Sequence, residues 1–300
     1  MKKAAIYTII KPNKSDSHLS GGFAVITTVE KILNEIGLST QIISPLDEWV
    51  DPSVFDIAVL ADIFNDPMGS KWFEPEQYGK FFNCPKFIVL ENSYTGCTPE
   101  PYGLGGKVDQ GGYRTNELSQ FMADLMARSS LNIFVSPLHR FEFENFLKTQ
   151  VPNPYDFYQP IDQNVFYNQR RTRDIPFLYV GALNNFKGLD IAIELFGDRG
   201  LHIAGRGDIS QYKLPSEAKY LGALAVEDLV SVYNRSQNFV HLPRWQEPFA
   251  RTVVEAAMCG CNLILNENVG AVSFGYDIRD PNVGTASRLD LKNRISQMWN

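Results

Sequence analysis

Residues 238–266, NFVHLPRWQEPFARTVVEAAMCGCNLILN, decide the fold of this chain. Residues 238–242 form a short, mostly apolar run that suits a buried strand, residues 248–259 carry apolar side chains at helical spacing, and residues 261–265 suit a second strand. The polar side chains lie in the loop and the helix rather than along the strands. This order predicts an open parallel sheet with a ligand site beyond the carboxyl ends of its strands.

Two glutamates stand eight positions apart in this stretch. Pro248 suits the first position of a helix, where its missing N–H costs nothing, so we expect Glu247 at the mouth of that helix. Glu255 follows two turns later on a largely apolar segment, where an unpaired carboxylate is costly to bury. It therefore needs hydroxyl or cationic partners, unless both glutamates are ordinary charges on a helix surface.

Length and charge narrow the classes of protein. The 300 residues suffice for one large domain or for two of about 150 residues each. The net charge is −6, and no basic run or aromatic–basic repeat indicates a nucleic-acid partner, so we expect a small or neutral one. The apolar run near the start, residues 4–10, is too short to span a membrane and has no cleavage region after it, which predicts a cytoplasmic protein.

The sequence shows no pattern typical of a metal site or a bound cofactor. The four cysteines, Cys84, Cys97, Cys259 and Cys261, lack metal-ligand spacing, so free and mostly buried thiols are favoured over a zinc site. No Asp-x-Asp pair is present. We therefore expect a protein without metal or cofactor.

The first half alternates short apolar runs with segments that can turn back as helices, which indicates an α/β fold with a parallel sheet. These runs are residues 4–10, 41–44, 55–61, 87–90 and 133–136. Gly21 and Gly22 begin the first predicted helix, where glycines allow a ligand to approach the backbone and the helix N-terminus favours an anion. A plain turn would have the same sequence.

Four further stretches of the first half invite a functional interpretation. Residues 71–82 carry aromatic side chains and lysines that could line an acceptor site or touch a lipid surface, although core packing is favoured and the acidic net charge does not support membrane contact. Residues 91–112 form a long Gly-, Pro- and Tyr-rich loop of the kind that is often functional. His139, at a helix start, could face a ligand or serve the structure. Residues 151–166 contain three prolines and suggest an interdomain linker.

The second half opens with a strand, residues 176–181, that ends in Gly181. Lys187 then precedes a helix, where its charge beside free backbone N–H groups would hold a diphosphate, unless it is simply a solvated lysine. Residues 201–204 form another strand, followed by Gly205 and Arg206 in a Gly-x-Gly sequence that is weak by itself.

Together these features resemble the retaining glycosyltransferases of the GT-B fold, a nucleotide-sugar-dependent group with an E-x7-E segment. The matching strings are Glu-Pro-Phe at 247–249, Glu-Ala-Ala at 255–257 and Cys-Gly-Cys at 259–261. The resemblance covers most of the chain and is firmest over residues 176–271. It implies two Rossmann-like α/β domains facing a cleft: an acceptor-side domain at 1–155, a linker at 156–172 and a nucleotide-sugar-binding domain at 173–300.

The same resemblance implies roles for individual residues. Glu247, beside the donor sugar, and Lys187, at the diphosphate, are the expected catalytic residues, and Glu255 is expected to hold the ribose hydroxyls. The expected donor-binding set is Gly21, Gly22, Gly181, Gly205, Arg206, Leu224, Arg244, Phe249, Arg251 and Glu255. The expected acceptor-side set is Glu91, Asn92 and His139.

The chain departs from the family pattern at two places. Ala182 stands where an arginine that grips the pyrophosphate is expected, and Arg206, Arg244 or Arg251 could replace it. Glu91 and Asn92 stand where a His-Asp pair is expected. Because of these departures, the resemblance does not identify the acceptor, and a protein that binds the donor without turning it over is a real alternative.

The resemblance implies a metal-independent retaining glycosyltransferase that moves a hexose from a UDP- or GDP-sugar to a hydroxyl of a sugar, lipid or small-molecule acceptor. The acceptor hydroxyl would attack from the side of the leaving group, and Glu247 would hold the donor sugar without forming a covalent bond. Two alternatives remain: a nucleotide-sugar epimerase or hydrolase on the same fold, and a non-catalytic nucleotide-sugar-binding protein.

Overall fold

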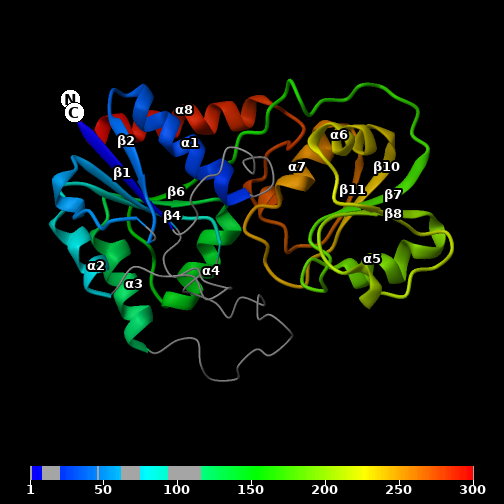
Figure 1. Cartoon of the computed structure of the whole chain (residues 1–300), viewed down its shortest axis with the longest axis horizontal. Helices are drawn as coiled ribbons and strands as arrows, with labels where there is room; N and C mark the ends of the chain where they lie inside the picture. The colour runs from blue at the N-terminus through cyan, green and yellow to red at the C-terminus, as the bar shows by residue number, and fades with distance from the viewer. Residues whose placement is uncertain (1, 9–20, 46, 62–74, 94–115, 300) are drawn as a thin grey trace. The chain divides into compact units, whose positions relative to one another are not determined.

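The computed structural model describes residues 2–8, 21–45, 47–61, 75–93 and 116–299 (Figure 1). The chain divides into two compact units. Unit 1 comprises Met1–Gln159 and Ala286–Asn300, and unit 2 comprises Pro160–Thr285.

Unit 1 is built on a six-stranded parallel sheet in the order β2-β1-β3-β4-β5-β6. Its strands are β1 (Lys3–Thr8), β2 (Ser39–Ile43), β3 (Ile57–Ala61), β4 (Phe87–Glu91), β5 (Leu131–Phe134) and β6 (Pro154–Asp156). Every residue of β3, β4 and β5 is buried, as expected for a parallel sheet that is covered on both faces.

The helices of unit 1 are α1 (Gly21–Glu35), α2 (Pro75–Gly79), α3 (Asn116–Arg128) and α4 (Pro137–Leu147). Figure 1 shows α1 on one face of the sheet, with α2 and α3 on the other. The apolar stripe of α1 predicted from the sequence faces the core, because Ile26, Val29, Ile32 and Leu33 are fully buried. Tyr78 and Phe81 are also buried, so the described part of the aromatic stretch 71–82 packs in the core.

Helix α8 (Asn282–Trp299) begins in unit 2 and continues into unit 1, where it lies beside α1 (Figure 1). Its Arg288 and Lys292 both pair with Glu35 at the end of α1. The backbone carbonyl of Ser287 accepts a hydrogen bond from Tyr155 Oη at 2.7 Å, and Ser287 Oγ accepts one from the N–H of Tyr158 at 2.9 Å. These contacts place 286–300 in unit 1. The domain bounds expected from the sequence, 173–300, put this segment in the second domain, although the family resemblance also implied a short C-terminal helix within 287–300 that crosses back.

Unit 2 is built on a five-stranded parallel sheet in the order β11-β10-β7-β8-β9. Its strands are β7 (Ile175–Val180), β8 (Leu201–Ala204), β9 (Lys219–Gly222), β10 (Ser236–His241) and β11 (Asn262–Leu265), and its helices are α5 (Leu189–Phe196), α6 (Val226–Arg235) and α7 (Arg251–Met258). The strand order reverses between β7 and β10, which is the position where open parallel sheets bind ligands.

One local expectation from the sequence needs correction, and another gains detail. Helix α7 begins at Arg251 rather than at Pro248, because Ala250 has a left-handed φ of 70° and residues 247–249 pair instead with the chain after β11. The stretch 156–172, expected to be a linker, contains the boundary between the two units at 159/160, and Phe157, Ile161 and Phe166 within it are buried.

Candidate functional site

The loop after β7 and the end of β10 approach each other closely in unit 2. Gly188 has a left-handed φ of 76°, and a Cβ atom placed there would lie 1.9 Å from the carbonyl oxygen of Leu242. Only glycine therefore permits this approach. Lys187, immediately before Gly188, is in turn fixed by a hydrogen bond from its N–H to Asn184 Oδ1 at 2.9 Å.

Glu247 is held in an extended segment beside this loop. Its N–H donates to the carbonyl of Asn268 at 2.7 Å, and its carbonyl accepts from the N–H of Gly270 at 2.9 Å. These two bonds form an isolated parallel bridge between Glu247 and Val269. The backbone geometry, rather than a helix start, sets the direction of the carboxylate.

The carboxylate of Glu247 joins Lys187 and His241. Lys187 Nζ lies 2.5 Å from Oε1, and His241 Nε2 lies 2.5 Å from Oε2. Their side chains are 16%, 10% and 2% exposed for lysine, glutamate and histidine, so the array is largely shielded from water. Lys187 Nζ also lies 5.4 Å from the ring centroid of Trp245. We refer to Lys187, Glu247 and His241 as the carboxylate array.

Electrostatics keep Glu247 ionised. Burial raises the pKa of its carboxyl, but the charges and hydrogen bonds of Lys187 and His241 outweigh burial and hold that pKa well below its usual range. At neutral pH the array therefore contains a carboxylate whose two oxygens each accept a short, charge-assisted or imidazole hydrogen bond.

His241 is the residue of this site that the sequence interpretation missed. It is the last residue of β10 and is 1% exposed. A polar residue that follows two apolar ones at the carboxyl end of a parallel strand is a signal that could have identified it. Its ring stacks on Phe239, with centroids 6.3 Å apart, which fixes the plane of the imidazole.

Glu255 lies elsewhere in the unit, between α6 and α7. Tyr233 Oη donates to Glu255 Oε2 at 3.3 Å, and the guanidinium nitrogen Nη2 of Arg251 lies 3.6 Å from Oε1. These are the hydroxyl and cationic partners that a buried carboxylate was expected to need. Burial raises the pKa of Glu255 despite the opposing effect of Arg251. No contact among the described residues joins Glu255 to Glu247.

The other predicted donor-site residues of unit 2 lie at the same edge of the sheet. Gly181 follows β7, and its N–H donates to the carbonyl of Ala204 at 3.1 Å. Arg244 follows β10 and pairs with Asp190 at 2.5 Å. Phe249 is buried against Phe274, and Leu224, after β9, is half-buried.

In unit 1 the predicted residues gather at the carboxyl ends of the strands. Glu91 ends β4 and is fully buried. Asn92 follows it and lies against Gly22 near the start of α1, where a Cβ atom would be 3.1 Å from Asn92 Oδ1. Gly21 is the first residue of α1. The greater part of the predicted loop 91–112 falls outside the described residues.

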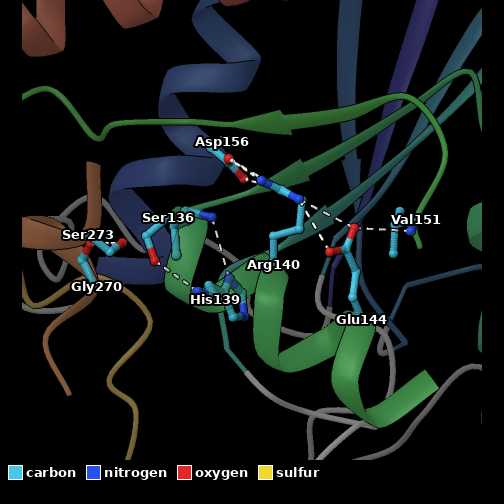
Figure 2. Close-up of polar contacts among 9 residues, drawn as sticks. Ser136, His139, Arg140, Glu144, Val151, Asp156, Gly270 and Ser273 are labelled. Carbon is cyan, nitrogen blue, oxygen red and sulfur yellow. Dashed lines mark hydrogen bonds and ion pairs between the residues drawn. The ribbon is translucent and has the colours of Figure 1, made fainter. Parts of the chain in front are cut away.

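His139 is fully buried in α4 and binds the backbone (Figure 2). Its Nε2 lies 2.8 Å from the carbonyl of Ser93, and its Nδ1 accepts a long bond of 3.4 Å from the N–H of Val135. Ser136 caps the helix through the N–H of His139 at 3.0 Å. Burial lowers the pKa of His139 to about 3. Its geometry suits a neutral ring that anchors the segment after β4.

Arg140, next along α4, makes an ion-pair network that ties this helix to the edge strand (Figure 2). Its Nε lies 3.0 Å from Asp156 Oδ1 at the end of β6, and its Nη1 lies 3.3 Å from Glu144 Oε2. Glu144 in turn accepts a bond from the N–H of Val151 at 3.2 Å. The network is structural and was not predicted from the sequence.

Part of the chain is similar in sequence to known proteins. Residues 161–273, which include the whole carboxylate array, match the family described as Glycosyl transferases group 1. Over 128 residues the chain is 28% identical to an uncharacterized 42.6 kDa protein in the cps region of Klebsiella pneumoniae, a match that covers 40% of this chain and about a third (33%) of that relative's length.

Solved structures resemble the chain over nearly its whole length. HepE of Anabaena in complex with UDP has a TM-score of 0.62 and 14% identity, covering 99% of this chain and 92% of that one. Sucrose-phosphate synthase of Thermosynechococcus elongatus has a TM-score of 0.60 and 13% identity, covering 99% and 91%. At such identities the likeness shows the fold, and it confirms the predicted α/β class with two Rossmann-like units of the GT-B type.

The described residues include no helix that is both long enough and apolar enough to cross a bilayer.

Proposed function

We propose that this chain, which carries a glycosyl transferases group 1 domain at residues 161–273, is a glycosyltransferase that moves a hexose from a UDP- or GDP-sugar to an acceptor hydroxyl. The carboxylate array carries the proposal. It lies where the strand order of the unit 2 sheet reverses, and it combines a cation with a carboxylate whose second oxygen is already held.

The charges of the array suit the bond that must break. Cleavage of a sugar–diphosphate bond builds negative charge on the leaving phosphate, and fixed cations and helix N-termini stabilise that charge. Lys187 stands two residues before α5, next to its N-cap Gly188, so its ammonium and the first N–H groups of that helix would face the diphosphate together. On donor binding Lys187 would exchange Glu247 for a phosphate oxygen.

Glu247 would then hold the donor sugar. His241 retains Oε2, so Oε1, once released by Lys187, is available to accept a hydrogen bond from a sugar hydroxyl. The carboxylate is still held at Oε2 by His241, which favours a role in orienting the sugar over a role as covalent nucleophile. Glu255, polarised by Tyr233 and Arg251, is assigned to the ribose hydroxyls.

Two finer features belong to the same proposal. The acceptor hydroxyl, on a sugar, a lipid or a small molecule, attacks from the side of the leaving group, and the departing phosphate takes its proton, so the anomeric configuration is retained. The reaction proceeds without a metal ion, because protein cations neutralise the diphosphate.

The second candidate is a non-catalytic nucleotide-sugar-binding protein. It is favoured by Ala182, which provides no charge in the loop after β7, and by the pairing of Lys187 with Glu247. The two candidates differ in turnover rather than in binding.

Thermal unfolding with UDP, GDP, UDP-glucose and GDP-mannose, each with and without EDTA, tests binding first, because a ligand specific for the folded state raises its stability. A selective rise that survives EDTA is expected. No rise with any of these compounds would remove the donor site from the proposal.

Release of nucleoside diphosphate from the stabilising donor, in the presence of a panel of acceptors, then tests turnover. We expect turnover in the wild type, loss of it in Glu247→Ala and Lys187→Ala, and unchanged rates in Arg235→Gln, a variant in an exposed ion pair of α6. Unchanged transfer in both site variants would refute the assignment, and binding without turnover in the wild type would favour the second candidate.

A further inference from the structure

Most of the positive charge at the carboxyl edge of the unit 2 sheet is already paired. Lys187 pairs with Glu247 at 2.5 Å, and Arg244 pairs with Asp190 at 2.5 Å. The third candidate for an anion site, Arg251, lies 3.6 Å from Glu255. A nucleoside diphosphate brings at least two negative charges, and each of these three cations must give up a carboxylate to meet them, so a cation that no carboxylate matches would bind the diphosphate at lower cost.

Arg206 is such a cation. It is exposed in the turn after β8, and no ion pair with it occurs among the described residues. It was one of three arginines that could compensate for Ala182, and the ion pairs of Arg244 and Arg251 now separate it from the other two.

The backbone places Arg206 next to the position that lacks a charge. The N–H of Gly181 donates to the carbonyl of Ala204 at 3.1 Å, and the N–H of Leu183 donates to the carbonyl of Arg206 at 2.9 Å. Ala182 lies between these two bonds and is exposed. Residues 181–183 and 204–206 thus run side by side, with position 182 beside the turn that contains Arg206.

Two glycines hold this turn against the neighbouring loop. A Cβ atom at Gly205 would lie 1.7 Å from the carbonyl oxygen of Gly181, and one at Gly207 would lie 2.7 Å from Leu183 Cβ. The N–H of Gly205 also bonds to the carbonyl of Gly222 at 2.9 Å, and Tyr220 Oη bonds to the carbonyl of Gly205 at 3.0 Å. The backbone under Arg206 is therefore fixed before any ligand arrives.

We propose that Arg206 supplies, from the turn after β8, the cation that grips the donor diphosphate in place of a charged residue at position 182. This inference rests on the proposed function. It assigns recognition of the diphosphate to two loops: Lys187 after β7 and Arg206 after β8. A guanidinium presents several N–H donors in a planar fork, which suits phosphate oxygens better than a lysine ammonium does.

Isothermal titration with UDP and GDP, and with uridine and guanosine as phosphate-free probes, tests the proposal. Arg206→Gln is expected to weaken binding of the diphosphate about 10- to 100-fold, the range for a lost charge-assisted hydrogen bond, and to leave the affinity for the nucleoside within about twofold. Arg206→Lys should lie between wild type and Arg206→Gln. Arg235→Gln, which breaks an exposed ion pair with Asp174, serves as the matched control and should bind as the wild type does.

Moving the positive charge from position 206 to position 182 distinguishes a lost phosphate contact from a folding defect. The double variant Arg206→Gln, Ala182→Arg should recover most of the lost affinity for the diphosphate. Equal affinity of Arg206→Gln and wild type for UDP and GDP, or an equal loss for diphosphate and nucleoside, would overturn the inference while leaving the proposed function intact. Absence of nucleotide binding in the wild type would instead overturn the proposed function and this inference with it.

Discussion

His241 Nε2 and Glu247 Oε2 lie 2.5 Å apart at the carboxyl end of β10. The ring donates to the carboxylate, so the proton resides on Nε2, and the buried Nδ1 has no hydrogen-bond partner among the described residues. With Oε2 bound to His241, Oε1 is the oxygen that meets Lys187. The histidine is therefore a positioning residue: it acts on a ligand through the carboxylate.

Removal of His241 should release the carboxylate without removing its charge. We expect His241→Ala to lower kcat about 10- to 100-fold, because small displacements of a positioned group have effects of that size, with a smaller effect on the affinity for UDP or GDP. His241→Gln, whose amide can donate to the same oxygen, should recover part of the rate. Steady-state kinetics beside nucleotide titration measures both quantities, and an equal loss in the Ala and Gln variants would contradict a positioning role.

Glu247 should also make the stability of the protein depend on pH. Its pKa is lowered on folding, so its contribution is complete above the unfolded value of about 4.3 and is lost as the pH falls through the folded pKa. Glu247→Gln leaves Lys187 without its carboxylate, and we expect a loss of up to about 3 kcal/mol at pH 7. Urea unfolding of wild type and variant between pH 3 and 7 should show this difference narrowing below about pH 4. A difference that does not change with pH would refute the ion pair.

His139 should make the stability of the protein depend on pH in a higher range than Glu247 does. Burial holds its pKa at about 3 in the folded protein, while the unfolded chain binds a proton near pH 6.5. Between these values the unfolded state binds the additional proton, so stability falls on acidification by up to about 1.4 kcal/mol per pH unit. His139→Gln should remove this slope. Urea unfolding at pH 8, where both states are neutral, gives the cost of the lost contacts alone, and an unchanged slope between pH 6 and 4.5 would show that His139 is not the source.

Gly188 and Gly275 allow the energetic cost of backbone strain to be distinguished from the cost of a steric clash, because both have a left-handed φ but only Gly188 is closely packed. Gly188 and Gly275 have φ values of 76° and 71°, but a Cβ atom meets Leu242 at 1.9 Å in the first and nothing within 4 Å in the second. Gly275→Ala should cost about 1–2 kcal/mol, the price of left-handed backbone for a residue with Cβ. Gly188→Ala should cost more and weaken nucleotide binding, because it separates Lys187 from β10. Equal destabilisation of the two variants, measured by urea unfolding, would contradict the close approach.

The described cysteines should resist alkylation. Cys259 and Cys261 are buried, and burial raises the pKa of their thiols to about 12 and about 11. Cys84 is also buried, and burial raises the pKa of its thiol. Since the thiolate is the reactive form, labelling by iodoacetamide at pH 8 should be slower than that of a free thiol by roughly 100-fold or more. Peptide mass spectrometry in buffer and in urea measures this, and rapid labelling of Cys259 in buffer would disprove it.

The sequence predicted the α/β class and most strands because buried parallel strands are continuous apolar runs, as in residues 87–90 and 133–136. It also identified Lys187 and Glu247 separately, each from local chemistry. It could not show that they meet, because their contact depends on Gly188 approaching the carbonyl of Leu242, a tertiary feature.

The remaining differences have the same origin. A proline followed by helical spacing predicts a helix from Pro248, yet pairing of Glu247 with Val269 delays it to Arg251. Residues 286–300 continue the chain of unit 2 without a break in pattern, and their membership of unit 1 follows from contacts with Glu35 and Tyr155. Long-range contacts of this kind leave no periodic signal in the sequence.

Helix α8 makes unit 2 an insertion within unit 1. A ribosome therefore completes every strand of both sheets before it synthesises the segment that covers α1, and Glu35 remains without Arg288 and Lys292 until then. All residues of unit 2 are therefore available before unit 1 is complete, because the contacts of α8 with α1 form only after the last stretch of the helix has been made.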